Sequence, residues 1–207
     1  MNIDELKALS KEELFELAEQ GNWHASLHIA REYRKGEVLP HNLEEAVKWY
    51  HTAASQMDEK ALFSEGASMY KIGKYELASI FWLEGANRDD ARCQACLAEL
   101  YEKGQGVTQN YYEAERWFFA SANQGYDSGQ YGLGVLYYNK NRLTDARNWF
   151  QKAAEQGHLD AQKVLNERFD GGRSLPSGGQ GRSMSGIISV VIVIILLIAF
   201  VSCVGRL

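Results

Sequence analysis

The residues that could carry out chemistry in this sequence are few, and the clearest are Cys93 and Cys96. A Cys-x-x-Cys spacing can form a redox-active pair or half of a zinc site. A complete zinc site of this type needs a second such pair, which the sequence lacks, and Cys203 stands alone in an apolar run. Three cysteines placed in this way do not make a disulfide framework. Cys93 falls on a recurring small-residue position, so we expect a buried, inert thiol.

Two other patterns resemble functional sites but are incomplete. His24 and His28 are four residues apart, which on a helix could hold zinc, but no glutamate lies between them in the HExxH arrangement and no third ligand is apparent. Gly104-Gln-Gly106 resembles a phosphate loop, but it lacks the following Lys-Ser/Thr and reads as a turn. We therefore expect no catalytic residue, no metal and no cofactor.

The charge distribution excludes one class of partner. Residues 1–170 carry 27 acidic side chains against 19 lysines and arginines, a net charge of −8, whereas residues 171–207 carry three arginines and no acid. Non-specific binding to nucleic acid needs a basic surface that neutralises phosphates. An acidic body of this kind is not expected to bind nucleic acid.

A repeating pattern organises most of the chain. A small residue is followed three and four positions later by two aromatic residues, and seven and eight positions later by small residues. The pattern occurs four times, as AVKWYHTAA (46–54), ASIFWLEGA (78–86), AERWFFASA (114–122) and ARNWFQKAA (146–154). These offsets lie on one helix face, and the 32- and 36-residue spacings are typical of stacked helical hairpins. The five tryptophans and most tyrosines are then expected to be packing residues.

The third copy resembles a named family. The segment CLAELYEKGQGVTQNYYEAERWFFASANQGYDSG (96–129) is similar to a Sel1-like repeat, with Gly104-x-Gly106-Val107, Asn110 and Trp117 among its marks. Copies two and four have shorter loops that resemble tetratricopeptide repeats. The resemblance covers about residues 10–170. It implies a right-handed all-α solenoid used for protein–protein interaction, in a family of scaffolds and adaptors, and it implies no catalytic residue.

The two ends of the solenoid are predicted to be half-units. Ser10 and Glu13 form a capping-box pattern that opens a lone helix ending near Gln20. At the other end, residues 158–169 are expected to form an unpaired first helix with Ala161 and Phe169 in register. The predicted domains are therefore a cap at 1–20 and four repeats with a closing helix at 21–170.

The C-terminal part predicts a membrane anchor. Residues 187–204 contain no charged residue, and at about 1.5 Å per residue they would span most of a bilayer core of about 30 Å. Residues 171–186 are rich in Gly and Ser and are expected to be a flexible linker. Arg168, Arg173 and Arg182 lie within about 20 residues before the apolar run, and Arg206 alone follows it. This asymmetry favours a tail-anchored, single-pass protein with its repeats in the cytosol. In a bacterium this would be the inner membrane.

The first helices of the hairpins are predicted to line a concave face that binds a partner. Residues at matched register on these helices include many cations and aromatics, which we take as candidate partner-binding residues: Arg31, Arg34, Lys35, Lys60, Phe63, Tyr70, Lys71, Arg92, Tyr131 and Tyr138. The plainer alternative is a solvated face with long cationic side chains. The functional alternative is a groove that attracts a protein or acidic peptide segment.

Two function classes remain from the sequence. The preferred one is a membrane-tethered adaptor or scaffold that recruits a protein partner. The alternative is an inhibitor or immunity-type protein that binds one effector tightly. Affinity would separate them, because an adaptor should bind several peptides weakly and an inhibitor should bind one folded partner near nanomolar.

Overall fold

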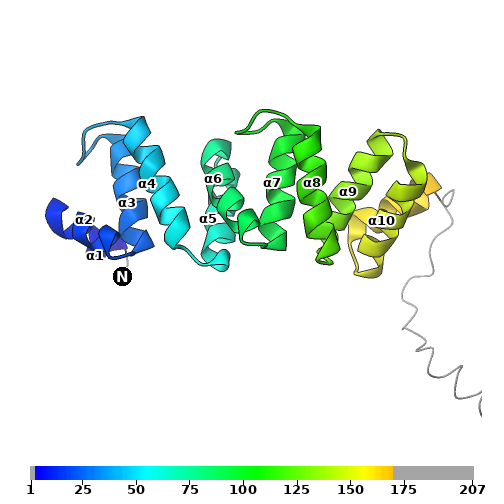
Figure 1. Cartoon of the computed structure of the whole chain (residues 1–207), viewed down its shortest axis with the longest axis horizontal. Helices are drawn as coiled ribbons and strands as arrows, with labels where there is room; N and C mark the ends of the chain where they lie inside the picture. Colours follow the sequence, from blue (N-terminus) through cyan, green and yellow to red (C-terminus); the bar gives the residue numbers. More distant parts are fainter. Residues whose placement is uncertain (1–2, 170–207) are drawn as a thin grey trace, which may run out of the picture. The chain divides into compact units, whose positions relative to one another are not determined.

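The computed structural model of the chain describes residues 3–169, and the regular structure in that range is helical (Figure 1). One compact unit ends at Leu165, and the residues from Asn166 onward belong to a second. The helices, in chain order, are α1 (Ile3–Lys7), α2 (Lys11–Glu19), α3 (Trp23–Lys35), α4 (Leu43–Gln56), α5 (Glu59–Lys71), α6 (Tyr75–Asn87), α7 (Ala91–Lys103), α8 (Tyr111–Asn123), α9 (Asp127–Asn139), α10 (Leu143–Glu155), α11 (Leu159–Val164) and the π-helix η1 (Leu165–Phe169).

The helices of the first unit pair as hairpins, which confirms the all-α solenoid. Helices α3 and α4, α5 and α6, α7 and α8, and α9 and α10 pack against each other, and we call these hairpins units one to four. Each hairpin then packs on the next along the row (Figure 1). Such an array buries its apolar faces only between neighbours in the chain.

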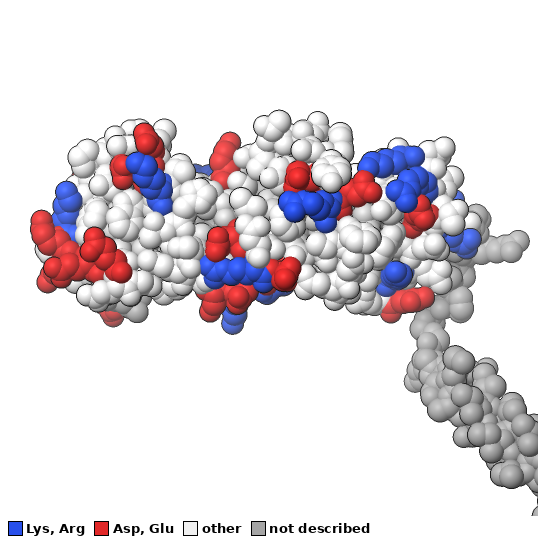
Figure 2. All heavy atoms as spheres, in the orientation of Figure 1, with Lys and Arg blue, Asp and Glu red and all other residues white. Residues whose placement is uncertain are grey.

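The N-terminal cap contains one helix that the sequence pattern did not predict. The capping box of Ser10 and Glu13 is confirmed, since the Ser10 hydroxyl accepts from the Glu13 N–H and the Glu13 carboxylate accepts from the Ser10 N–H. Helix α1 precedes it, has only five residues and packs on α3. The cap therefore contains two helices rather than a lone helix. Acidic side chains gather at this end of the molecule (Figure 2).

Small residues allow the helices to approach closely. A Cβ added at Gly66 would lie 2.3 Å from Nε1 of Trp82, and one added at Gly132 would lie 2.2 Å from Cε1 of Phe118. Atoms cannot come this close, so the aromatic rings occupy space that only glycine leaves free. The alternation of small and large residues in the repeat is thus a packing pattern.

The aromatic pairs differ from the simplest interpretation of the repeat. The second aromatic of each pair is at most 3% exposed in every unit: Tyr50, Trp82, Phe118 and Phe150. The first aromatic is buried in units two and three, but Trp49 and Trp149 are only half-buried. The second residue is therefore the more constant core mark.

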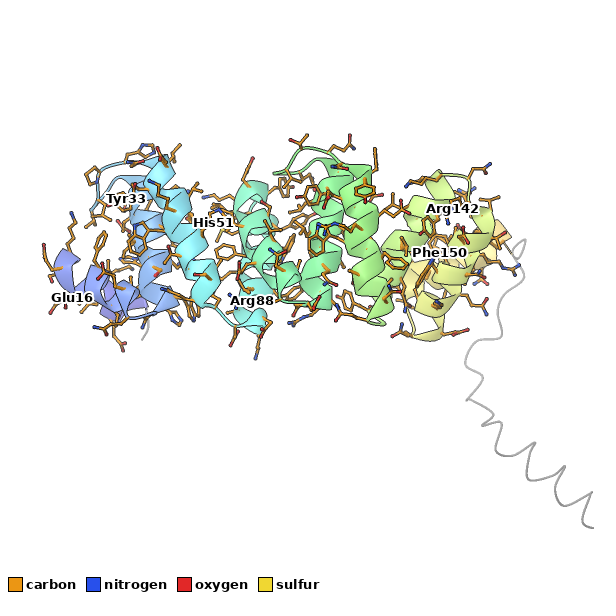
Figure 3. All side chains as sticks on the ribbon, viewed as in Figure 1. Glu16, Tyr33, His51, Arg88, Arg142 and Phe150 are labelled. Atoms are coloured by element: carbon orange, nitrogen blue, oxygen red, sulfur yellow. The ribbon has the colours of Figure 1, made fainter. Side chains whose placement is uncertain are left out.

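The turn between units one and two differs from the other junctions. Gly21, Asp89, Gly125 and Gly157 have positive φ where a second helix ends and the next unit begins. Helix α4 instead ends at Gln56 and is followed by Met57 in an extended conformation, with φ −79° and ψ 153°. It packs on α6 more than on α5. The guanidinium of Arg88, at the end of α6, donates to the carbonyl oxygens of Ser55 and Met57 there. Arg88 is labelled in Figure 3. The last carbonyl groups of a helix commonly accept hydrogen bonds from backbone N–H groups of a left-handed turn. At the end of α4, the Arg88 side chain supplies such donors instead.

Of the three elements predicted for the C-terminal part, only the helix lies within the described residues. The predicted helix 158–169 is present, but it divides into α11 and the π-helix η1, with Ala161 fully buried. Among residues 3–169, no helix is long and apolar enough to cross a membrane. The predicted linker 171–186 and span 187–204 lie outside the described residues.

Candidate partner-binding surface

A pocket of about 410 Å³ lies on the surface shared by the first helices of units two and three. Helix α5 contributes one wall, α7 the other, and Trp82 of α6 closes it. The lining residues, most of them apolar or aromatic, are Phe63, Ala67, Ser68, Tyr70, Lys71, Trp82, Cys96 and Glu99. We call this the α5–α7 pocket.

Trp82 owes its position in the pocket to the small residue opposite it. Gly66 on α5 leaves room for the indole, whose Nε1–H donates to the carbonyl oxygen of Phe63 at 3.3 Å. The Tyr70 ring lies 5.5 Å from the Trp82 ring and 5.1 Å from the Tyr75 ring, so three aromatic side chains pack together. Ring contacts of this kind hold an aromatic wall in one conformation before a ligand arrives.

Arg92 does not line the pocket but lies over the ring of Phe63, which does. Its guanidinium lies 4.7 Å from the centre of the Phe63 ring and 2.5 Å from a carboxylate oxygen of Asp90. Burial acts to raise the pKa of Asp90, but hydrogen bonds from Arg92 and from the Cys93 backbone outweigh it and lower that pKa. Asp90 therefore stays ionised and holds Arg92 over the ring.

The two cysteines have different surroundings but the same chemical character. Cys93 is fully buried, where a Cβ on Gly85 would lie 2.5 Å from its sulfur, and Cys96 lines the pocket. Burial raises the pKa of both thiols, that of Cys96 to about 12. The thiolate form required for nucleophilic or redox chemistry is therefore disfavoured at neutral pH.

The predicted cations do not form a free basic cluster. Arg31 pairs with Glu65 at 3.4 Å, and Lys35 pairs with Glu37 at 3.6 Å. The Arg34 guanidinium donates to the Tyr50 hydroxyl at 3.3 Å. In the view of Figure 2, acidic and basic side chains are interspersed along the units. Much of the predicted positive charge is thus paired within the protein.

The remaining predicted residues fall in different places. Phe63, Tyr70 and Lys71 come together in the pocket, whereas Lys60 is exposed near the start of α5 and does not line it. In unit four, Tyr131 stacks on His158 with ring centres 4.5 Å apart, and Tyr138 is 37% exposed. The sequence interpretation missed Ala67, Ser68 and the thiol of Cys96 as pocket residues, although their spacing on α5 and α7 places them on the expected face.

The histidine pair shows no sign of a metal site. The His24 ring stacks on Trp23, with ring centres 3.5 Å apart, and burial lowers the pKa of both His24 and His28. Within residues 3–169, no three His, Cys, Asp or Glu side chains are grouped so that they could hold a metal ion.

Parts of the chain are similar to known repeat proteins. Residues 23–56, 91–126 and 127–158, which correspond to units one, three and four, match the Sel1 repeat family. A sel1-like repeat-containing protein of Acanthamoeba polyphaga mimivirus is 37% identical over 84 residues, 41% of this chain and 16% of the relative. A component of the ERAD-associated E3 ubiquitin-protein ligase of Arabidopsis thaliana is 36% identical over 90 residues, 39% of this chain and 14% of the relative.

Solved structures share the fold. A protective antigen of uropathogenic Escherichia coli with an SLR fold is 30% identical, with a TM-score of 0.53 over 79% of this chain and 37% of that one. A Sel1 repeat protein of Oxalobacter formigenes is 23% identical, with a TM-score of 0.54 over 80% of this chain and 50% of that one. The chain therefore spans half or less of each of these relatives. Its helical hairpins, their sequence marks and these likenesses identify it as a Sel1-repeat protein.

Proposed function

We propose that this protein is a membrane-tethered scaffold that binds a segment of a partner protein on the surface of its first helices. The observation that carries the proposal is the α5–α7 pocket, an aromatic hollow of about 410 Å³ on the face where the sequence predicted binding. Sel1 repeats are modules of protein–protein interaction, and the pocket supports the proposal that the partner binds on this face.

The lining of the pocket favours an apolar side chain as the anchor of the partner. Phe63, Tyr70 and Trp82 offer aromatic surface, while Lys71 and Glu99 lie on the same lining with opposite charges. A buried aromatic or aliphatic anchor in such a pocket commonly supplies most of the binding energy of an interface. Because Arg31, Lys35 and Arg92 are paired within the protein, we expect binding to depend only weakly on salt.

The membrane part of the proposal rests on the sequence of residues 187–204, an apolar run without charge. The arginines that precede it favour a topology with the repeats in the cytosol. Tethering would raise the local concentration of the scaffold near membrane-associated partners. Carbonate washing of membranes tests this part: the full chain should stay in the pellet, and release of the full chain into the supernatant would contradict the anchor.

Site-specific crosslinking tests the binding surface. A photoreactive phenylalanine at Ser68, an exposed lining residue of the pocket, should capture a discrete set of proteins in cells. The matched control replaces Gln151, which is exposed on the second helix of unit four. Identical crosslinked bands from both positions, or none from position 68, would contradict the proposal. One partner held near nanomolar would instead favour an inhibitor or immunity-type role.

A further inference from the structure

A second pocket, of about 440 Å³, lies at the N-terminal end, away from the α5–α7 pocket. It is formed by α1, α2, the last turns of α3 and the loop that follows. Its apolar lining consists of Leu6, Leu9, Leu14, Val38 and Leu39, and its ionisable or imidazole lining of Lys7, Lys11, His28, Glu32, Lys35 and Glu37. We call this the α1–α3 pocket.

Glu32 occupies a position in α3 that units three and four fill with a buried leucine and unit two fills with the exposed Ser68. Each of Glu32, Leu100 and Leu136 is seven residues after the first small mark of its unit. Leu100 and Leu136 are 0% and 2% exposed, and Glu32 is only 6% exposed. A carboxylate is therefore buried at a core position where the fold is satisfied by an apolar side chain.

This carboxylate is incompletely satisfied. Among the described residues, Oε2 of Glu32 is buried and has no hydrogen-bond partner. Burial lowers the pKa of His28, so its imidazole is uncharged at neutral pH and does not neutralise Glu32. A buried acceptor without a donor costs stability, so the packing of the fold does not explain its presence. A ligand that donates a hydrogen bond to Oε2 would explain why a carboxylate is present at this position.

The remaining charges of the pocket restrict the ligand further. Three lysines and two glutamates line it, and one pair, Lys35 and Glu37, is already joined at 3.6 Å. The Lys11 ammonium lies 5.8 Å from the Phe15 ring and is exposed. A purely cationic ligand would meet Glu32 but would be repelled by the lysines. A ligand with a positive and a negative group would satisfy both.

We propose that the α1–α3 pocket binds a free α-amino acid with an apolar side chain. The ammonium group donates to Oε2 of Glu32, where a charge-assisted hydrogen bond is strongest. The carboxylate faces Lys11, and the side chain packs against the leucines. The ligand thus brings the donor that Glu32 lacks and leaves the net charge of the pocket unchanged.

Thermal unfolding of the full chain in detergent micelles, with calorimetric titration of L-leucine, tests this inference. L-Leucine should raise the melting temperature in a saturable manner. Leucinamide, which lacks the carboxylate, and N-acetyl-leucine, which lacks the ammonium group, should each bind at least tenfold more weakly. The absence of any response to leucine, phenylalanine or methionine would overturn the proposal, as would equal binding of leucine and leucinamide.

A pair of variants assigns the binding to Glu32. Glu32→Gln keeps the shape of the side chain and should weaken leucine binding at least tenfold. The matched control is Glu16→Gln, which changes an exposed carboxylate on α2 that does not line the pocket and should bind as the parent does. If Glu32→Gln binds leucine as the parent does, the proposal is wrong. Partner crosslinking from position 68 should be the same in both variants, so the two proposals fail independently.

Discussion

The guanidinium of Arg88 donates a hydrogen bond to the carbonyl oxygen of Met57, 2.5 Å away and 31 residues earlier in the chain. The same group reaches Ala54 and Ser55 and is held by Glu84 at 2.6 Å. One side chain at the end of α6 therefore closes the C-terminus of α4. It joins units one and two at the junction that lacks a positive-φ turn residue.

Removing this side chain should weaken that junction. Arg88→Ala should lower the free energy of unfolding by about 1–3 kcal/mol, because carbonyl groups at the end of α4 lose a charged donor. Urea denaturation followed by circular dichroism measures the loss. Lys48→Ala is the control, since its ion pairs with Glu44 and Glu45 are exposed and should contribute much less to the free energy of unfolding. Equal losses would mean that the Arg88 contacts do not hold the junction.

Filling the space at Gly66 should also destabilise the protein. Although alanine is a better helix former than glycine by about 1 kcal/mol, its Cβ would lie 2.3 Å from the Trp82 indole. Gly66→Ala should therefore cost about 1–3 kcal/mol, as overpacking does, and should change the fluorescence of Trp82. Ser68→Ala, on the same helix but exposed, should be within about 0.5 kcal/mol of the parent. A stabilised Gly66→Ala variant would show that the helices are not in close contact there.

The repeat register predicts unequal losses for two tryptophans. Trp117 is 7% exposed, and Trp117→Ala should cost about 3–5 kcal/mol. Trp23 lies outside the recurring positions, is half-buried and stacks on His24, so Trp23→Ala should cost clearly less. Chemical denaturation of both variants measures the difference. Equal values would indicate that the packing marks have been misassigned.

Much of the fold could be predicted because the signal is local and repeated. The positions of Ala46, Trp117 and their equivalents recur at spacings that only stacked hairpins explain, and the Ser10 capping box uses residues three apart. Helix α1 was missed because five residues carry too little periodicity. The role of Arg88 was missed because its contacts are with residues more than 30 positions away and follow from the changed turn at Met57.

The binding surface could be predicted only in part. Register placed Phe63, Tyr70 and Lys71 on one face, and they do line one pocket. Register did not reveal which cations are paired, because Glu65 reaches Arg31 from the next unit. The unusual position of Glu32 could have been recognised from the sequence, because units three and four have Leu100 and Leu136 at the equivalent positions. Its missing hydrogen bond became visible only with the packing around it.

Replacing Glu32 with the leucine that units three and four carry at this position should stabilise the protein. Glu32→Leu should raise the free energy of unfolding by about 1–3 kcal/mol, because it removes a buried, unsatisfied acceptor from a position that leucine fills in units three and four. Glu16→Leu, at an exposed position of α2, should have little effect. A destabilised Glu32→Leu variant would mean that the carboxylate has a structural partner.

The most direct measurement for the proposed function is the affinity of a crosslinked partner for two matched variants. Ala67→Arg places a long side chain in the lining of the α5–α7 pocket, whereas Ala120→Arg makes the same change at a half-buried alanine on the second helix of unit three. By calorimetry, Ala67→Arg should weaken binding at least tenfold, about 1.4 kcal/mol, while Ala120→Arg should bind as the parent does. Equal affinities for the parent and Ala67→Arg would contradict binding at this pocket.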